Sequence, residues 1–113
     1  MKPLKFAAPL IPLVLSGQKD TTWRINDDKD FSVKDQISCR HLDGTEFAQA
    51  QILWVKTTTF ANLSNEDRLG HEPFSSEKEL YKTYKQYYGI EVDPTTIVKV
   101  IKFKLIAKPN ALL

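Results

Sequence analysis

The stretch GQKDTTWR at residues 17–24 joins a predicted helix to a predicted strand, and the rest of the fold is interpreted outward from it. Gly17 follows an apolar run at residues 6–15 and is typical of the left-handed residue that ends a short helix. Residues 21–25 are rich in β-branched and aromatic side chains, which predicts a strand. Lys19 is left in the loop between them. The stretch therefore brings an amine, a hydroxyl and a guanidinium close to one sharp turn.

Alternation along the predicted strand sorts its side chains onto two faces. Thr22 and Arg24 should share one face, while Trp23 and Ile25 should share the other. We expect Trp23 to pack in the core in preference to stacking on a base. The face that carries Thr22 and Arg24 would point into the same space as Lys19, which predicts the floor of a small pocket.

Length and charge limit the classes of function. The 113 residues fit one domain, which we expect to cover residues 1–113. Sixteen basic and fourteen acidic side chains give a formal net charge of +2. That balance is too even for a protein that holds long nucleic acid by phosphate neutralisation alone. A small ligand, or RNA held at one local patch, is compatible with it.

Cysteine usage and the N-terminal region bear on the compartment. Cys39 is the only cysteine, so no intrachain disulfide can form, which fits a reducing compartment. Two lysines precede the apolar run at residues 6–15 in the outline of a secretory signal, but Pro9 and Pro12 interrupt it. No segment reaches the roughly 18 apolar residues of a membrane-spanning helix. We therefore expect a cytoplasmic protein that does not bind membranes.

The remaining segments predict further strands and a hairpin. Asp43-Gly44 is the strongest hairpin signal in the chain. The strand that returns from it is long enough to need a bend or a bulge, and residues 52–55 at its centre are expected to be buried. The last strand is expected to be central, with Ile97, Ile101, Phe103 and Leu105 on one face. The five predicted strands cover residues 4–7, 21–25, 36–42, 46–60 and 95–106.

Capping signals predict two or three short helices. Pro9 and Pro12 suit the first turn of one helix, because a missing N–H costs nothing there. Ser64 can cap a second helix over residues 65–68. Ser76 begins a third, with Glu79 completing a capping box. Its stripe of Leu80, Tyr84, Tyr87 and Tyr88 is more typical of core lining than of a ligand cage.

Two charged regions favour structural roles. Residues 26–35 are polar and aspartate-rich and predict a surface loop, held to the core by Phe31 and Val33. The aspartates lack regular ligand spacing, so no metal site is expected, and no cofactor is implied. Lysines without nearby acids in the last strand indicate protection of a sheet edge, or a weak RNA-facing patch. These are Lys99, Lys102, Lys104 and Lys108.

Taken together, these segments predict an α+β fold, a partly closed β-barrel of about five to six strands with two or three short helices. The chain then resembles the ASCH domain family of the PUA-like superfamily. That family carries the pattern G-x-K-x-x-(E or T)-x-R, which here is Gly17, Lys19, Thr22 and Arg24. The resemblance covers nearly the whole chain. It departs at Lys34, where the family usually has glycine, and this change affects the rim of the pocket.

One branch of the family consists of small bacterial amidohydrolases that remove acetyl groups from N(4)-acetylcytidine, and threonine at position 22 resembles that branch. The resemblance implies a catalytic set of Lys19, Thr22 and Glu72. Glu66 is the alternative carboxylate, because the match at Glu72 requires a shift of one residue in a loop. It also implies that the substrate-binding residues are Arg24, Gly17 and His71.

Two mechanisms fit these residues. Thr22 can attack the acetyl carbonyl while a neutral Lys19 takes its proton, which requires the lysine pKa to fall by roughly 3 units. Alternatively Lys19 stays charged and acts electrostatically, and Glu72 is the base. A second pair, Cys39 and His41, is too small a set for zinc and is poorly placed for a nucleophile pair.

The first functional hypothesis is therefore a hydrolase that cleaves a linear amide in N(4)-acetylcytidine or a related acylated pyrimidine nucleoside. The alternative is a non-catalytic PUA-like module that binds RNA or a modified base, and a ribonuclease is a weaker third. The expected partner is a small nucleoside or modified base, with RNA as the alternative. The sequence indicates no obligate protein partner.

Overall fold

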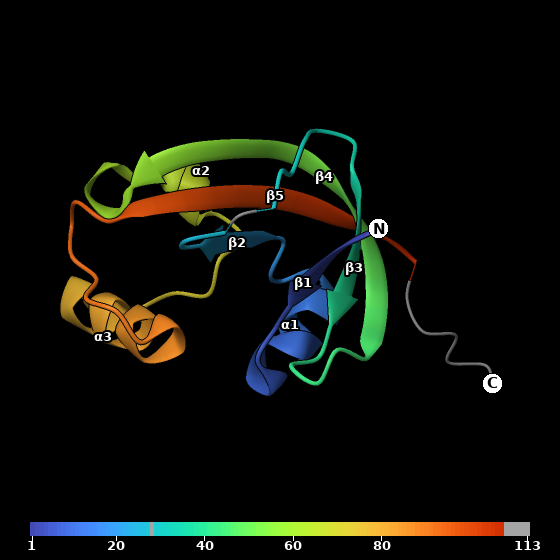
Figure 1. The fold of residues 1–113 in the computed structure, drawn as a ribbon, viewed down its shortest axis with the longest axis horizontal. Helices are drawn as coiled ribbons and strands as arrows, with labels where there is room; N and C mark the ends of the chain where they lie inside the picture. Colours follow the sequence, from blue (N-terminus) through green and yellow to red (C-terminus); the bar gives the residue numbers. More distant parts are fainter. Residues whose placement is uncertain (28, 108–113) are drawn as a thin grey trace.

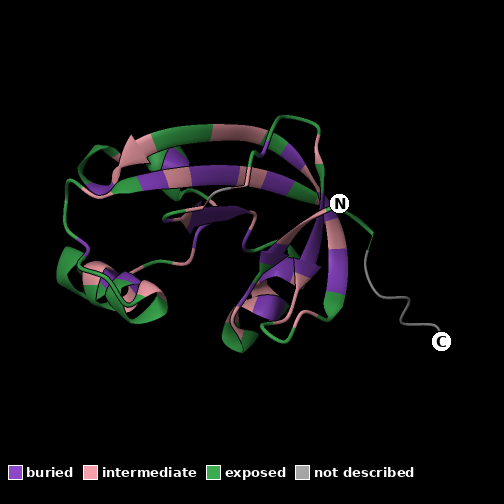
Figure 2. Ribbon diagram, in the orientation of Figure 1, coloured by how far each residue is buried: buried purple, intermediate pink, exposed green. Residues whose placement is uncertain are grey.

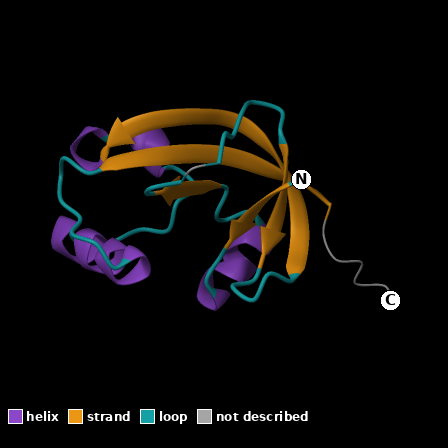
Figure 3. Cartoon of the chain, in the orientation of Figure 1, coloured by secondary structure: helices purple, strands orange, loops and turns teal. Residues whose placement is uncertain are grey.

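The computed structural model describes residues 1–27 and 29–107, in which a curved five-stranded sheet carries short helices near its two ends (Figure 1; Figure 3). This confirms the predicted α+β class. The strands are β1 (Lys2–Lys5), β2 (Thr21–Arg24), β3 (Gln36–Arg40), β4 (Glu46–Thr59) and β5 (Ile97–Ala107). The helices are α1 (Ile11–Ser16), α2 (Asn65–Arg68) and α3 (Glu77–Tyr88), with 3-10 turns η1 (Ala8–Leu10) and η2 (Phe60–Asn62).

The strands lie in the order β1-β3-β4-β5-β2, so β4 is the central strand. The last strand, β5, lies inside the sheet between β4 and β2, as predicted, although the middle position of the five belongs to β4. Only β1 and β3 run parallel among the paired strands of the described residues. Both β4 and β5 are long and arch over the rest of the chain (Figure 1). No helix within residues 1–27 and 29–107 has the length and apolar character to cross a bilayer.

The predicted irregularity of the long return strand is confirmed. Pairing between β4 and β5 changes register at Gln49/Ala50 and at Ile52/Trp54. A register change interrupts the alternation of side chains and bends the strand. Ile52 is fully buried, but Leu53 is 40% exposed. The prediction of a continuously buried centre was therefore wrong, since the second irregularity falls inside it.

Two apolar clusters lie under the two ends of the arch, and strand β5 contributes to both (Figure 2). Val98 and Val100 pack in the cluster with α3, whereas Ile101 and Phe103 pack in the cluster with α1. The two pairs lie on opposite faces of β5, because their residue numbers differ in parity. The predicted common face of Ile101, Phe103 and Leu105 is confirmed, because all three pack in the cluster with α1. Ile97, predicted on the same face, is 64% exposed.

The loop between β2 and β3 is held to the core by Phe31, which is buried. Val33 is 56% exposed, so its predicted anchoring role was wrong. The chain turns away after Phe31, where the Asp35 carboxylate accepts a hydrogen bond from the Ser32 N–H. Lys34 adopts φ 74°, in the left-handed region that favours glycine. That conformation gives a physical reason for the glycine that the ASCH pattern usually has at this position.

The lysines of β5 do not protect a sheet edge, because β5 lies inside the sheet. Lys99 donates a hydrogen bond to the Lys29 carbonyl at 2.8 Å, and Lys102 pairs with Asp20 at 2.7 Å. Lys104 is exposed, and Lys108 lies outside the described residues. Two of the three lysines described here thus hold the chain together, which argues against a continuous basic patch.

Candidate active site

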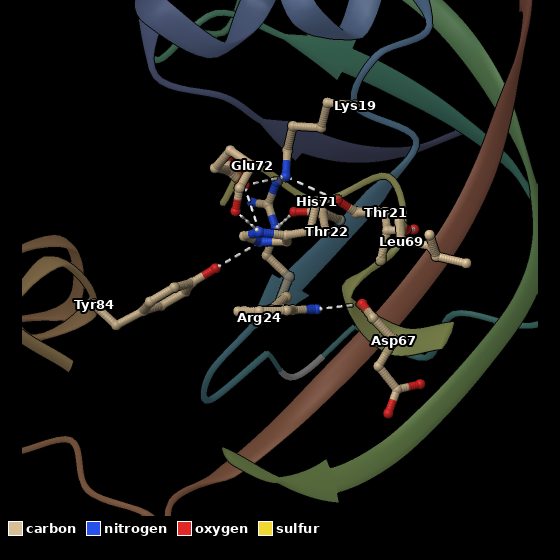
Figure 4. Close-up of polar contacts among 10 residues, drawn as sticks. Lys19, Thr21, Thr22, Arg24, Asp67, Leu69, His71, Glu72 and Tyr84 are labelled. Atoms are coloured by element: carbon tan, nitrogen blue, oxygen red, sulfur yellow. Dashed lines mark hydrogen bonds and ion pairs between the residues drawn. The ribbon is translucent and has the colours of Figure 1, made fainter. Parts of the chain in front are cut away.

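Lys19 is buried at the turn between α1 and β2. Helix α1 ends at the left-handed Gly17, as predicted, and the Lys19 N–H then donates to the Leu13 carbonyl at 3.0 Å. Only 2% of the lysine side chain is exposed. Its Nζ donates to the Thr21 carbonyl at 2.8 Å and to Glu72 Oε1 at 2.6 Å (Figure 4). The ammonium group is therefore held on two sides by oxygen atoms inside the protein.

The segment that follows α2 is fastened to the same turn by backbone hydrogen bonds. The N–H groups of Asp20 and Thr21 both donate to the Gly70 carbonyl, at 2.9 and 3.1 Å. The Thr21 hydroxyl donates to the Leu69 carbonyl at 2.7 Å. These bonds carry Glu72 to Lys19 although 53 positions separate them in sequence.

The structure separates the two candidate carboxylates. Glu72 contacts the Lys19 ammonium directly, whereas Glu66 lies on the exposed side of α2 and no ion pair among the described residues includes it. The lysine and the glutamate of the implied catalytic set are thus brought together. Their catalytic roles remain a prediction.

Thr22 and Arg24 lie on one face of β2, as alternation along the strand predicts. Arg24 Nε donates to the Thr22 hydroxyl at 3.1 Å. The guanidinium also lies over the Phe6 ring, 4.9 Å from its centroid. Both residues border the same cavity as Lys19 and Glu72, so the predicted pocket floor is present.

This cavity has a volume of about 370 Å³ and opens between the two apolar clusters. One wall comes from Phe6 and Leu10, and the opposite wall from α3 and Trp23. The tyrosine stripe of α3 was predicted mainly as core lining, but three of its members line the cavity. The aromatic and apolar lining residues are Phe6, Ala7, Leu10, Trp23, Leu42, Phe74, Tyr84, Tyr87 and Tyr88.

Two predicted substrate-binding residues do not line this cavity. Gly17 ends α1 and faces a separate hollow beside Leu15 and Phe103. His71 is buried behind Trp23, and the two rings stack with centroids 3.6 Å apart. Direct ligand contact by Gly17 or His71 is therefore not supported. Trp23 itself is 2% exposed, which confirms its predicted place in the core.

The charges in the site follow from burial and pairing. Burial lowers the pKa of Lys19 from 10.5 to about 8, although the negative charge of Glu72 opposes the shift. Burial alone would raise the pKa of Glu72, but the hydrogen bond from His71 and the Lys19 charge together lower it to about 2. The pair at pH 7 is therefore mainly an ammonium and a carboxylate.

Other reactive side chains lie apart from this site. Cys39 is fully buried in the α1 cluster, and burial raises the pKa of its thiol to about 12. The His41 ring packs edge-on against Phe47. Within residues 1–27 and 29–107, no group of three histidine, cysteine, aspartate or glutamate side chains could hold a metal ion.

The sequence reasoning missed the aromatic wall. Tyr84, Tyr87 and Tyr88 were recognised as one stripe, but nothing local indicates that part of this stripe faces a cavity. The width of the apolar stripe could have suggested the cavity. Tyr87 makes the stripe wider than a 12-residue helix needs for packing against a core. Tyr87 is 57% exposed.

Comparison with known proteins identifies solved structures that share this fold. Neither a protein-family model nor a curated protein matches the chain, but solved structures do. A protein from Enterococcus faecalis V583, described by the family model DUF984, has a TM-score of 0.75 at 14% identity, over 90% of this chain and 72% of that one. An ASCH domain from Lactobacillus crispatus JV V101 has a TM-score of 0.72 at 15% identity, over 94% and 79%.

The ASCH protein of Zymomonas mobilis also matches, with a TM-score of 0.63 at 12% identity, over 94% of this chain and 71% of that one. The chain has a PUA-like ASCH fold. The partly closed barrel predicted from the sequence is thus confirmed in its five-stranded form. At such identities the ASCH likeness is one of fold, so the functional argument rests on the side chains described above.

Gly70 should be required for the backbone hydrogen bonds that join the segment after α2 to the turn at Lys19. Its φ is +78°, and a Cβ atom there would overlap the Asp20 carboxylate. We expect Gly70→Ala to lower the free energy of unfolding by about 2 kcal/mol or more, as left-handed strain adds to displacement of Asp20. Urea denaturation measures the change.

Gly89→Ala is the matched control, because Gly89 has a similar φ of +67° but open space around its Cβ position. It should cost only the conformational strain, about 1 kcal/mol. Equal losses in the two variants would show that the contact between Gly70 and Asp20 has no energetic importance.

The ion pair can be tested through the titration of Lys19. Its amine should titrate near pH 8 in the folded protein. Glu72→Gln should lower this pKa further, because the carboxylate charge favours the ammonium form. NMR of the lysine side-chain Cε and Nζ resonances follows the titration.

Glu66→Gln is the control and should leave the Lys19 titration unchanged. The lowered pKa of Lys19 also makes the free energy of unfolding depend on pH. Between pH 8 and 10.5 the folded state has lost the proton that the unfolded state still binds, so the Lys19 contribution to stability rises with pH. A Lys19 pKa that responds to Glu66→Gln and not to Glu72→Gln would refute the pairing.

Proposed function

We propose that this protein is an ASCH-type amidohydrolase that removes the acetyl group from N(4)-acetylcytidine or a related acylated pyrimidine nucleoside. The observation that supports it most is the buried Lys19–Glu72 pair, 2.6 Å apart, beside Thr22 in an aromatic cavity. Perturbed ionisable groups in a cleft are typical of functional sites.

The cavity suits a nucleoside in size and lining. Its volume of about 370 Å³ lies near the lower end of the range typical of small-molecule pockets, about 300–1,000 Å³. Tyrosine rings of α3 offer flat surfaces against which a pyrimidine can pack. Polar side chains among the lining residues include the bonded pairs Lys19–Glu72 and Arg24–Thr22.

The charge state favours the second of the two mechanisms considered from the sequence. A lysine with a pKa of about 8 is mainly protonated at pH 7, so it is a poor base. An ammonium has three N–H donors, and two of those of Lys19 are bound to Thr21 and Glu72. In our proposal the third donates to the acetyl oxygen and stabilises the charge that develops there.

Glu72 is the proposed base, since it is ionised and holds Lys19 through Oε1. The hydroxyl of Thr22 attacks the acetyl carbon while Glu72 accepts its proton. The C–N bond then breaks, and the proton passes from Glu72 to the departing exocyclic nitrogen, which gives cytidine and an acetylated Thr22. Water, deprotonated by Glu72, cleaves this ester, and acetic acid leaves with regeneration of the hydroxyl.

Arg24 would hold the substrate and not react. Its Nε is bound to the Thr22 hydroxyl oxygen, which fixes that oxygen in place. Its remaining N–H groups are available to the pyrimidine carbonyl. This assigns Arg24 to substrate orientation, as the family resemblance implies.

Incubation with N(4)-acetylcytidine tests the proposal. The wild type should release cytidine and acetate, and Lys19→Ala and Glu72→Gln should each lower kcat/KM by about 100-fold or more, because a charge-stabilising donor or a base is lost. Thr22→Ala should abolish formation of an acetylated protein, seen by intact mass after rapid quenching.

Lys104→Ala and Thr57→Ala are matched controls on exposed positions of the same sheet and should keep full activity. No release of acetate by the wild type would refute the enzyme. Salt-dependent binding of RNA without turnover would favour the binding module instead. Turnover by the Thr22→Ala protein would indicate that water, and not the threonine, attacks the acetyl carbon.

The pH profile separates the two roles of Lys19. If the charged ammonium stabilises the oxyanion, kcat/KM should fall as pH rises through about 8, where Lys19 loses its proton. A rate that instead rises through this pH would indicate that the neutral amine is the base. Steady-state kinetics between pH 6 and 9.5 distinguishes the two, with roughly tenfold change per pH unit beyond the pKa.

A further inference from the structure

A row of hydrogen bonds runs from α3 to the ion pair, through a buried histidine (Figure 4). His71 Nε2 lies 3.0 Å from the Tyr84 hydroxyl. On the other side of the ring, Nδ1 lies 2.9 Å from Glu72 Oε1 and 2.9 Å from the Glu72 carbonyl. Glu72 Oε1 in turn accepts from Lys19. The four side chains form one continuous series.

The protons in this series have one consistent arrangement. Tyr84 is deeply buried, which raises the pKa of its hydroxyl well above 10, so it keeps its proton and can donate. Burial lowers the pKa of His71, so the ring is neutral at pH 7. A neutral imidazole has one donor and one acceptor nitrogen. Because Glu72 can only accept, Nδ1 must carry the hydrogen, and Nε2 accepts from Tyr84.

The histidine ring is held firmly in this orientation. It stacks on Trp23 with an angle of 14° between the planes. The Trp23 indole N–H donates to the Asp67 carbonyl at 3.0 Å, which ties the stack to α2. Phe74 approaches the same ring, with centroids 6.0 Å apart. A rotation of His71 would therefore break both hydrogen bonds and the stack.

The two carboxylate oxygen atoms of Glu72 therefore differ in their hydrogen bonding. Both Lys19 and His71 reach Oε1, while none of the hydrogen bonds among residues 1–27 and 29–107 involves Oε2. Glu72 borders the cavity that Thr22 and Tyr84 also line. Two donors on one oxygen fix the rotation of a carboxylate, and they leave its other oxygen for a ligand.

We propose that His71 and Tyr84 are positioning residues: through Nδ1–H of His71 they hold Glu72 Oε1 against Lys19 and leave Oε2 as the oxygen that takes the proton during turnover. The charged and titratable groups facing this pair are Glu72, Lys19, Arg24, Tyr87 and Tyr88. His71 itself does not line the cavity, so it acts through Glu72. This inference deepens the proposed function, and its activity test rests on that function.

The tautomer of His71 can be tested without any turnover. NMR of a protein with ¹⁵N-labelled imidazole rings distinguishes a protonated Nδ1 from a protonated Nε2. His41→Gln assigns the two histidines. We expect His71 to be the neutral Nδ1–H form at pH 7, and Glu72→Gln to perturb the Nδ1 signal. A neutral Nε2–H form, or a doubly protonated ring, overturns the proposal.

Tyr84→Phe tests positioning in catalysis, because it removes the hydroxyl and keeps the aromatic wall. We expect kcat to fall by about 3- to 10-fold, the loss of roughly one hydrogen bond, while KM changes less than twofold. The Nε2 resonance of His71 should shift in the same variant. A purely structural hydroxyl would leave kcat unchanged.

Tyr81→Phe is the matched control on the same helix. The Tyr81 hydroxyl faces Glu77 at 3.4 Å, away from the cavity, so kcat and the His71 signals should stay as in the wild type. Equal kcat in the Tyr84→Phe and Tyr81→Phe proteins overturns the positioning role while the amidohydrolase stands. If the wild type shows no turnover, the proposed function fails, and the tautomer experiment still decides the arrangement of His71.

Discussion

A buried ammonium group constrains this structure more than any other feature. Removing a charged lysine from water is costly unless the charge is paired and its donors are bonded. The Thr21 carbonyl and the Glu72 carboxylate meet that need for Lys19, and they come from two distant parts of the chain. The hydrogen bonds around Gly70 that unite these parts are thus a requirement of the charge as well as of the fold.

The residues that lie behind the ion pair in the protein interior are mainly aromatic. Trp23, His71 and Tyr84 combine stacked rings with hydrogen bonds at their edges, so the same side chains fill the core and orient polar groups. Stacking alone would allow the rings to slide, and hydrogen bonds alone would allow them to tilt. The combination holds Glu72 in a defined orientation at the edge of the cavity.

Local signals in the sequence were sufficient for much of this arrangement. The helix end at Gly17 and the face shared by Thr22 and Arg24 follow from backbone preference and alternation, which act over a few residues. The exposure of Leu53 coincides with a register change between β4 and β5, and the two buried faces of β5 depend on clusters built from distant segments. No local pattern in the sequence records either. The same holds for His71, whose neighbours come from three separate segments and whose place behind Trp23 was missed.

The arch of β4 and β5 also determines which ligands the protein can accommodate. One wall of the cavity belongs to the cluster around α1 and the other to the cluster around α3, and the two clusters share the curved strands. The second irregular position of β4, between Ile52 and Trp54, pairs with Phe103 and Lys102 of β5. Both of these residues bond to Asp20, which is next to Lys19 in the chain. A change of curvature at this position would therefore move the reacting groups together with the walls of the cavity, so substrate size and reaction chemistry are linked through the same two strands.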